Sequence, residues 1–253
     1  MTALLLVLAV VAAARGVWSP CGLSMLSTIT PIGERGRGNR YAATAAWYVV
    51  GSTAGGLSLG LVVALGAAVM PGSVADGPVL LVAGLVAVAS DLRLGGFQVP
   101  IHRRQVNERW LDVYRPWVYG AGFGWQVGSG FATYIMTAAN HLLVVALVAR
   151  GSAATALATC GVFGLVRGVA VLLTRSATSP AGLLEVHERV HRVGPACRWA
   201  VVAVEGAVAV AAAARVAPWL AAGALAAVGV ATAWATRSRD VPVCSLDVRR
   251  LDA

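Results

Sequence analysis

Residues 49–70 read VVGSTAGGLSLGLVVALGAAVM, a run of 22 residues that contains no charged side chain. A helix needs about 20 apolar residues to cross the hydrocarbon core of a bilayer, so this segment is long enough to span a membrane. Further apolar runs occupy residues 78–90, 131–149, 153–174, 200–214 and 218–235. None of them alternates apolar and polar residues with a period of two, as a membrane β-barrel requires. The sequence therefore predicts an all-α integral membrane protein.

The composition excludes a soluble globular domain. Charged residues make up 12% of the chain, hydrophobic residues make up 58%, and the mean hydropathy is +0.75. A soluble domain carries roughly 25% charged residues. The net charge of +9 comes from 20 basic residues, all of them arginine, and most lie between the apolar runs. Arginines in such loops determine topology and meet anionic headgroups, so we expect membrane lipid as a partner, no nucleic acid and no cofactor.

The apolar runs predict about seven transmembrane helices and an orientation. The expected spans are residues 3–30, 42–70, 78–96, 118–149, 152–174, 197–214 and 217–236. The loops after the first, third, fifth and seventh spans hold 16 arginines, whereas the opposite loops hold only Arg150 and Arg215. The positive-inside rule then gives a plasma-membrane protein with its N-terminus outside and its C-terminus in the cytoplasm. One kinked element at 197–236 would reduce the count to six, although Pro218 favours two helices.

These spans fall into two groups of three and a last helix. The expected units are residues 1–96 as the first three-helix repeat, 97–117 as a cytoplasmic loop rich in arginine and aromatic residues, 118–214 as the second three-helix repeat, and 215–253 as the C-terminal helix and cytoplasmic tail. The second repeat includes an amphipathic connector at 175–196. Because three is odd, the second repeat is expected to be inverted relative to the first, as in many transporters.

The first span is interrupted by Ser19, Pro20, Cys21 and Gly22. Pro20 removes a backbone hydrogen bond, and Gly22 lets another backbone approach closely. A broken helix is tolerated in lipid only where it faces protein or a wet cavity. Cys21 is therefore the candidate reactive residue, and unsatisfied N–H groups at the break, together with Arg15, would favour its thiolate. The alternative is a kinked packing helix with an inert, buried cysteine.

A similar pattern opens the fourth span. Residues 122–130 read GFGWQVGSG, which compares with RGVW at residues 15–18. In inverted-repeat transporters, paired broken helices form the site near the membrane midplane. We therefore expect Trp125, Gly128 and Gly130 to form the site together with the break in the first span, and the first span to pack closely on this segment.

On these residues the sequence resembles the cytochrome c biogenesis CcdA and DsbD transmembrane-domain family, within the LysE-like transporter superfamily. The resemblance covers about residues 3–214. It rests on the SPC sequence at residues 19–21, the basic stretch before the fourth span, and GFGW at residues 122–125. In that family, Pro-Cys pairs in helices 1 and 4 form a disulfide relay. The relay carries reducing equivalents from cytoplasmic thioredoxin to thiol proteins outside the cytoplasm.

The resemblance implies that Pro20 and Cys21 match the first pair, while Val127 and Gly128 stand where the second pair is expected. Release of a mixed disulfide needs a resolving thiol. Cys160 could supply it only if its Cα lay within about 7 Å of the Cα of Cys21, and we expect the two to be farther apart. The expected function is thiol-redox or sulfur-linked transfer across the membrane through Cys21. A thioredoxin-like or other redox protein, or a membrane partner subunit, would be the partner.

A cysteine-independent transporter of a small solute, or a partner subunit on the same fold, is the alternative function. The residues that bear on it are Arg15, Asn140, His141, Arg167 and Glu205, all within predicted spans. Polar and charged groups inside a membrane are costly and mark a pair or a functional site. If Glu205 paired with one of the two arginines, the other arginine would remain unpaired. It could then bind an anion, or its side chain could snorkel toward the interface. Transport would require a polar cavity near Arg15, Asn140 and His141.

His187, Glu188 and His191 match the H-E-x-x-H pattern of zinc proteases. In that pattern two histidines one helical turn apart bind zinc and the glutamate activates water. A membrane zinc metalloprotease is therefore a third possible function. His187 and His191 could also form a non-catalytic metal site. The simplest interpretation is an amphipathic connector that binds no metal. Whether the protein is an enzyme stays open at this stage.

Overall fold

The computed structural model of the protein describes residues 1–69, 76–100 and 109–237, and this part is helical without a strand. In chain order the helices are α1 (Thr2–Arg15), η1 (Gly16–Trp18), α2 (Pro20–Thr28), α3 (Pro31–Gly36), α4 (Tyr41–Val69), α5 (Asp76–Leu92), η2 (Leu94–Gly96), α6 (Trp110–Val113), α7 (Pro116–Gly128), α8 (Ala139–Arg150), α9 (Ala153–Val169), η3 (Ala170–Ser176), α10 (Pro180–Val216) and α11 (Pro218–Arg237). The predicted all-α class is confirmed.

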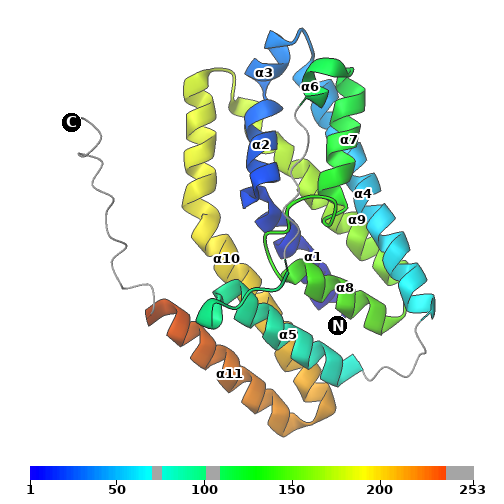
Figure 1. The fold of residues 1–253 in the computed structure, drawn as a ribbon, viewed down its shortest axis with the longest axis vertical. Helices are drawn as coiled ribbons and strands as arrows, with labels where there is room; N and C mark the ends of the chain where they lie inside the picture. The colour runs from blue at the N-terminus through cyan, green and yellow to red at the C-terminus, as the bar shows by residue number, and fades with distance from the viewer. Residues whose placement is uncertain (70–75, 101–108, 238–253) are drawn as a thin grey trace.

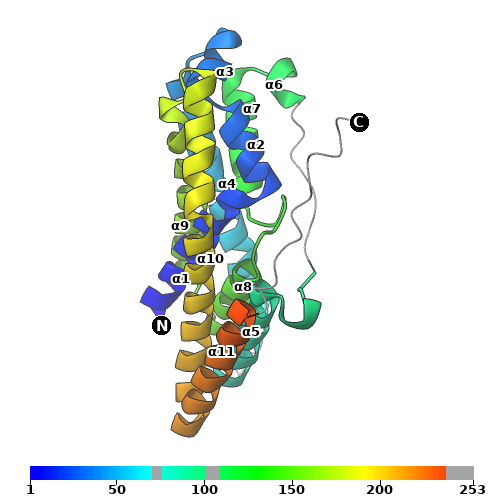
Figure 2. The ribbon, with the colours of Figure 1, turned by 90° about the vertical axis from the view of Figure 1, so that its left-hand side faces the viewer.

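The helices form an elongated bundle with α1 near its middle (Figures 1 and 2). On one side α4 packs against α7 and α9, and on the other α10 packs against α5 and α11. Between these two groups α1 contacts α8, α9 and α10. The largest core cluster joins apolar residues of α1, α8, α9 and α10, so α1 holds the two groups together.

The helix lengths confirm a multi-pass membrane protein. Four segments are long and apolar enough to cross a bilayer: Tyr41–Val69, Ala153–Ser176, Pro180–Val216 and Pro218–Arg237. The pair Thr2–Trp18 and Pro20–Thr28 makes a fifth if its two halves form one bent span. Two shorter apolar helices, Gly77–Leu92 and Ala139–Arg150, fall within the predicted third and fourth spans. The predicted count of about seven is reached only if these shorter helices also cross the bilayer.

Three predicted boundaries are settled by the helix ends. The predicted span 118–149 is wrong as one helix, because it consists of α7 and α8 with a non-helical segment at 129–138. Residues 175–196 are not a separate connector, because α10 continues through Pro195. A single proline removes one hydrogen bond, and α10 packs on neighbours along both halves of its length. The break after Val216 is confirmed, since Ala217 is extended and Pro218 starts α11.

Glycines bring α4, α7 and α9 into backbone contact. A Cβ atom on Gly124 would overlap the carbonyl oxygen of Tyr48, and one on Gly128 would overlap that of Ser52. These two α7 glycines therefore face α4. The prediction that the first span makes this close contact is wrong, because matching glycines lie on α4: a Cβ on Gly51 or Gly55 would overlap the α7 backbone. The second half of the first span meets α7 through larger side chains, as when Met25 packs in one cluster with Phe123.

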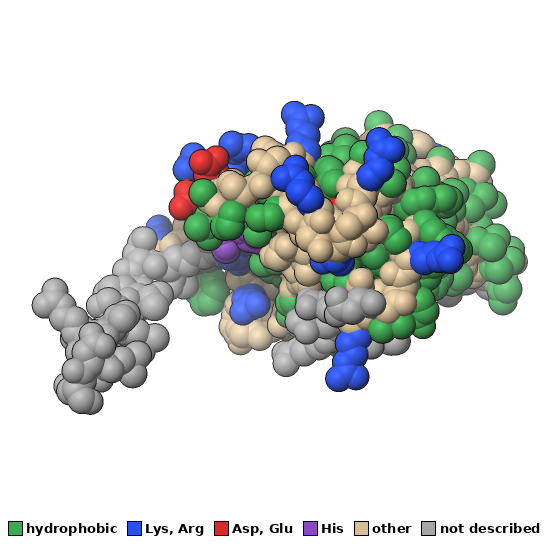
Figure 3. All heavy atoms as spheres, turned by 90° about the horizontal axis from the view of Figure 1, so that it is seen from above, with side chains coloured by type: hydrophobic (Ala, Val, Ile, Leu, Met, Phe, Trp, Pro, Cys, Tyr) green, Lys and Arg blue, Asp and Glu red, His purple; other side chains and the backbone are tan. Residues whose placement is uncertain are grey.

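Positive side chains surround the end of the molecule formed by α3 and the neighbouring helix ends, as the end-on view in Figure 3 shows. Apolar side chains cover much of the remaining surface in the same view. This distribution suits helix ends that lie in water next to a flank that lies in lipid. The expected orientation of the termini stays a prediction, and the tail from residue 238 onward, with Cys244, lies outside the described residues.

Candidate functional site

The break between α1 and α2 positions Cys21. The chain turns by 68° between Trp18 and Pro20. Ser19 is the N-cap of α2: its Oγ accepts a hydrogen bond from the amide of Gly22 at 3.1 Å and donates one to the carbonyl oxygen of Gly16 at 2.7 Å. Pro20 is the first residue of α2, where its missing N–H costs nothing. The break is therefore the capped start of a new helix.

Cys21 is the second residue of α2 and is 2% exposed. The first turn of a helix presents N–H groups that no carbonyl of the helix can satisfy, and its dipole favours negative charge. The side chain is enclosed, so the water path expected for a reactive thiol requires movement of α2.

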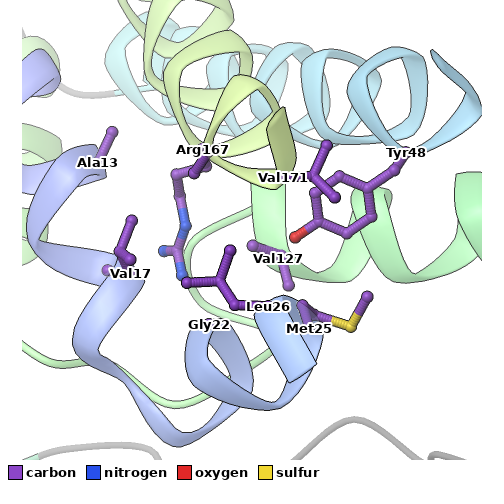
Figure 4. A pocket seen from close by; sticks show the side chains of 11 residues that line it. Ala13, Val17, Gly22, Met25, Leu26, Tyr48, Val127, Arg167 and Val171 are labelled. Carbon is purple, nitrogen blue, oxygen red and sulfur yellow. The ribbon is translucent and has the colours of Figure 1, made fainter. Parts of the chain in front are cut away.

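Arg167 of α9 extends into the break from the opposite side (Figure 4). It is 4% exposed, and its electrostatic neighbours are the Tyr48 hydroxyl and the Cys21 thiol. A Cβ atom on Gly16 would lie 2.8 Å from Cζ of Arg167, so only glycine leaves room for the guanidinium there. Its Cζ also lies 5.5 Å from the centre of the Phe163 ring.

The guanidinium of Arg167 lies in a small and mostly apolar enclosure. The adjoining cavity has a volume of about 20 Å³, enough for one water molecule. Its walls are Ala13, Gly16, Val17, Gly22, Met25, Leu26, Tyr48, Val127, Arg167, Ala170 and Val171. Nη2 of Arg167 has no hydrogen-bond partner within the described part of the chain. A buried cation in this state favours a nearby anion.

Glu205 forms no ion pair with Arg15 or Arg167 within the described ranges. An ion pair instead joins Arg37 and Glu34, at 2.6 Å. Glu205 of α10 is fully buried, its two carboxyl oxygens lack hydrogen-bond partners among the described residues, and its charged neighbour is Asp91. Sequence alone does not show which helix faces oppose each other: Arg167 extends into the α1–α2 break, whereas the charged neighbour of Glu205 is Asp91 of α5.

The contacts of Arg15 are with groups other than Cys21. Its guanidinium stands 5.6 Å from the centre of the Trp18 ring, and its electrostatic neighbours are Cys197 and Asp91. The positive group next to Cys21 is Arg167 instead. The sequence showed that Arg167 lies within a predicted span, but it did not show which residues Arg167 faces, because that depends on the rotation of α9.

The other cysteines belong to different surroundings. Cys160 lies seven residues before Arg167 on α9, which is about 10 Å along the helix axis. Its Cβ lies 3.2 Å from the position that a Cβ on Gly60 of α4 would take. Among the residues that the structure describes, Cys160 and Cys197 form no disulfide bond. The expected separation of the Cys21 and Cys160 Cα atoms stays a prediction.

The residues expected from the fourth span are only partly brought to the break. Trp125 is 45% exposed and donates a hydrogen bond to Ser58 Oγ at 3.1 Å on the outer side of α4. Gly128 faces α4, and Gly130 has a φ of 73° and lies against Phe163. Asn140 donates to the Gly130 carbonyl oxygen at 3.4 Å, so it holds the second break rather than lining the first.

His187 and His191 do not assemble a metal site in the described ranges. Their helix α10 brings no third ligand near them, and no group of three His, Cys, Asp or Glu side chains is placed to hold a metal there. The ring of His187 instead hydrogen-bonds Ser27 Oγ at 3.2 Å and the Leu183 carbonyl oxygen at 2.9 Å. The metalloprotease interpretation lacks the site that it requires.

A buried cluster around Glu34 was not predicted from the sequence. Glu34 is fully buried and accepts hydrogen bonds from Arg37 at 2.6 Å, from Thr44 at 2.6 Å and from the Tyr119 hydroxyl at 2.7 and 2.9 Å. The one feature of the sequence that could have indicated this cluster is a single acidic residue, Glu34, within an arginine-rich loop. The cluster ties α3 to α4 and α7, and so fixes the segment that follows α2.

Comparison with known proteins gives relatives of one name. The chain is 32% identical over 170 residues to the methylamine utilization protein MauF of Paracoccus versutus, covering 64% of this chain and 62% of that protein. It is 34% identical over 158 residues to MauF of Paracoccus denitrificans, covering 59% and 56%, and 29% identical over 151 residues to MauF of Methylorubrum extorquens, covering 58% and 53%.

The matched regions span between 53% and 62% of the length of these three relatives. No family model and no solved structure matches the chain. The resemblance to the CcdA and DsbD proteins therefore stays a prediction. The chain is a multi-pass, all-α membrane protein that is similar to methylamine utilization proteins named MauF.

Proposed function

We propose that this protein is a membrane component of methylamine utilization that relays thiol–disulfide exchange through Cys21. The pathway comes from the printed name of the relatives. The chemistry comes from one observation: a buried arginine, Arg167, has the Cys21 thiol and the Tyr48 hydroxyl as its electrostatic neighbours. The Cys21 sulfur therefore meets both a positive charge and the N-terminus of α2, and the nucleophilic form of cysteine is the anionic thiolate.

A single cysteine can complete the relay if two other proteins supply the remaining thiols. The Cys21 thiolate attacks an acceptor disulfide, which forms a mixed disulfide and releases one acceptor sulfur as a thiolate. A thiolate of a donor dithiol protein then attacks the Cys21 sulfur and releases the second acceptor sulfur. The donor's other thiol attacks its own half of the donor–Cys21 disulfide and regenerates the Cys21 thiolate. Two electrons and two protons pass from the donor dithiol to the acceptor disulfide.

This scheme requires Cys21 to become accessible. Because Cys21 is 2% exposed, α2 has to move for either protein to reach the sulfur. The 68° turn before Pro20 is a suitable hinge, since the chain there consists of a short η1 and one capping residue. The donor would be a thioredoxin-like protein and the acceptor an extracytoplasmic disulfide protein, or a membrane subunit that acts for either.

We also propose that residues 1–96 and 118–214 are related by an inverted repeat. The helix contacts support this proposal, because α4 pairs with α9 and α5 with α10, while the broken spans contact the opposite repeat. Thus α1 meets α9 and α10, as α7 meets α4 and α8 meets α5. Exchanging the two groups leaves this pattern unchanged, and paired broken helices then occupy equivalent places.

The decisive experiment combines thiol labelling with growth. In a strain whose growth on methylamine depends on this protein, Cys21→Ser should abolish growth, while Cys160→Ser, the matched control, should preserve it. A membrane-permeant maleimide should label Cys21 in wild-type membranes, and a Cys21 mixed disulfide should be trapped when the donor's second cysteine is removed.

Separate outcomes would contradict the two parts of the proposal. Growth of Cys21→Ser at the wild-type rate, with Cys21 unlabelled, would reject the relay and leave solute transport as the leading function. Growth on methylamine without the protein would reject the pathway, whatever the behaviour of Cys21.

A further inference from the structure

A second cavity, larger than the one at Arg167, lies on the other side of the α1–α2 break. Its volume is about 220 Å³, the space of about seven water molecules in the liquid. It is formed by the end of α1, the end of α5 and the segment after it, the non-helical segment before α8, and the middle of α10. The lining residues are Arg15, Ser90, Asp91, Arg93, Gln98, Tyr134, Ile135, Met136 and Arg198.

The lining of this cavity carries an excess of positive charge. Three guanidinium groups, those of Arg15, Arg93 and Arg198, meet one carboxyl group, that of Asp91. None of the three arginines forms an ion pair with any described residue, since the one ion pair lies at Glu34. Arg198 donates to the backbone carbonyl oxygen of Asp91 at 2.7 Å, which holds the guanidinium in place without neutralising it.

The one carboxylate of the cavity is already engaged. Its two oxygens accept hydrogen bonds from the backbone amide of Ala138 at 2.8 Å and from the hydroxyl of Thr137. These contacts hold the segment before α8 against α5. Asp91 therefore has a structural partner, and its single charge cannot balance three arginines.

We infer that this cavity binds a small oxyanion. Arginine presents a planar fork of donors that matches the oxygens of phosphate, sulfate or a carboxylate. Gln98 and Tyr134 add neutral donors to the same space, and the volume admits a small anion with a few waters. An anion there would replace the water around the three guanidinium groups and balance the excess charge. The site is separate from Cys21, so the inference does not depend on the proposed thiol relay.

Two sources can supply such an oxyanion: a free ion from the water phase or the phosphate of an anionic lipid headgroup. The first arm of the test uses full-length protein in nanodiscs of neutral phosphatidylcholine at constant ionic strength. Inorganic phosphate or sulfate should raise the midpoint of thermal unfolding in a saturable manner, whereas chloride should not. The second arm uses nanodiscs that contain phosphatidylglycerol and measures by native mass spectrometry how many anionic lipids remain bound.

Arg93→Gln is the primary variant, because Arg93 is exposed at the cavity rim and the fold does not depend on a hydrogen bond from it. Removal of one charge-assisted contact should weaken oxyanion binding about tenfold. Arg15→Gln should have a similar effect. Arg215→Gln, an exposed arginine outside the cavity at the end of α10, should leave binding unchanged.

Each result of the two binding experiments leads to a different conclusion. Saturable binding of phosphate or sulfate that weakens in Arg93→Gln and not in Arg215→Gln supports a site for a free anion. Retention of phosphatidylglycerol that is lost in Arg93→Gln supports the same site with a lipid headgroup in it. Binding that is equal in wild-type protein and Arg93→Gln, or no binding in either arm by folded protein, overturns the inference.

Discussion

The two broken spans occupy comparable places in the chain, yet they are broken in different ways. The first break is short: η1 is followed by Ser19, which caps the next helix with its own side chain. The second, at 129–138, is longer, and Ala138 at the start of α8 makes no such cap. Its segment is held instead by Asp91 from a different helix. Both breaks therefore hold a serine whose hydroxyl accepts from the amide three residues ahead, but only at Ser19 does a helix start there, and only the second break is also held by a long-range carboxylate.

The charges that meet the two breaks differ in sign. Arg167 approaches the first break, where the N-terminus of α2 and Cys21 lie. Asp91 approaches the second break and accepts the amide hydrogen of Ala138. The position that would match Cys21 in the second break is Gly128, whose face is closed by α4. In the proposed repeat, a thiol is thus present at one break only, and at the other break a carboxylate holds the chain.

The largest effect is expected from filling the glycine contact at the second break. Gly128→Leu should prevent stable folding or cost more than about 3 kcal/mol, because the side chain would have to displace the backbone of α4. Gly223→Leu on α11 is the control, since a Cβ there meets no described atom within 4 Å. Fluorescence-detected gel filtration and thermal unfolding in detergent would measure both. Equal stability of the two variants would contradict the close contact between α7 and α4.

The next effect tests the charge at the first break. In a protein whose only cysteine is Cys21, Arg167→Gln should slow alkylation of the thiol about tenfold, because a positive charge near the attacking sulfur is lost. Arg15→Gln should leave the rate unchanged, since Arg15 faces Cys197 and Asp91. Alkylation rates in membranes at fixed pH provide the measurement. A slower rate in Arg15→Gln alone would exchange the roles of the two arginines.

The smallest effect compares the serine at each break. Ser19→Ala should lower the free energy of unfolding by about 1 kcal/mol, the usual cost of losing an N-cap. Ser129→Ala should cost less. The Ser129 hydroxyl also donates three residues back, to the Gln126 carbonyl oxygen at 2.8 Å, and accepts from the amide three residues ahead, that of Ala132, at 3.3 Å, but no helix starts there. Paired thermal unfolding curves in one detergent would show the difference. A larger loss for Ser129→Ala would mean that the second break also depends on local capping.

The sequence predicted features that follow from local chemistry. Residues 49–69 of the uncharged run lie within α4, Pro20 marks the start of α2, and Pro218 marks the start of α11. It could not predict which helix faces meet. The pairing of Arg167 with the first break and of Gly128 with α4 depends on the rotation of α9 and α7. At Pro195 the local signal was misleading. A proline usually ends a helix, but α10 continues through Pro195 because it packs against neighbouring helices.

The length of α10 has a mechanical consequence. Its 37 residues make a rod of about 55 Å, whereas the hydrocarbon core is about 30 Å thick. Unless it is steeply tilted, the rod must therefore extend into water, and the end that bears His187 and His191 is the polar one. Arg198 lies farther along the same continuous helix, at the anion cavity. A soluble protein that bound the polar end of α10 and shifted it would therefore also shift Arg198, because both lie on one helix.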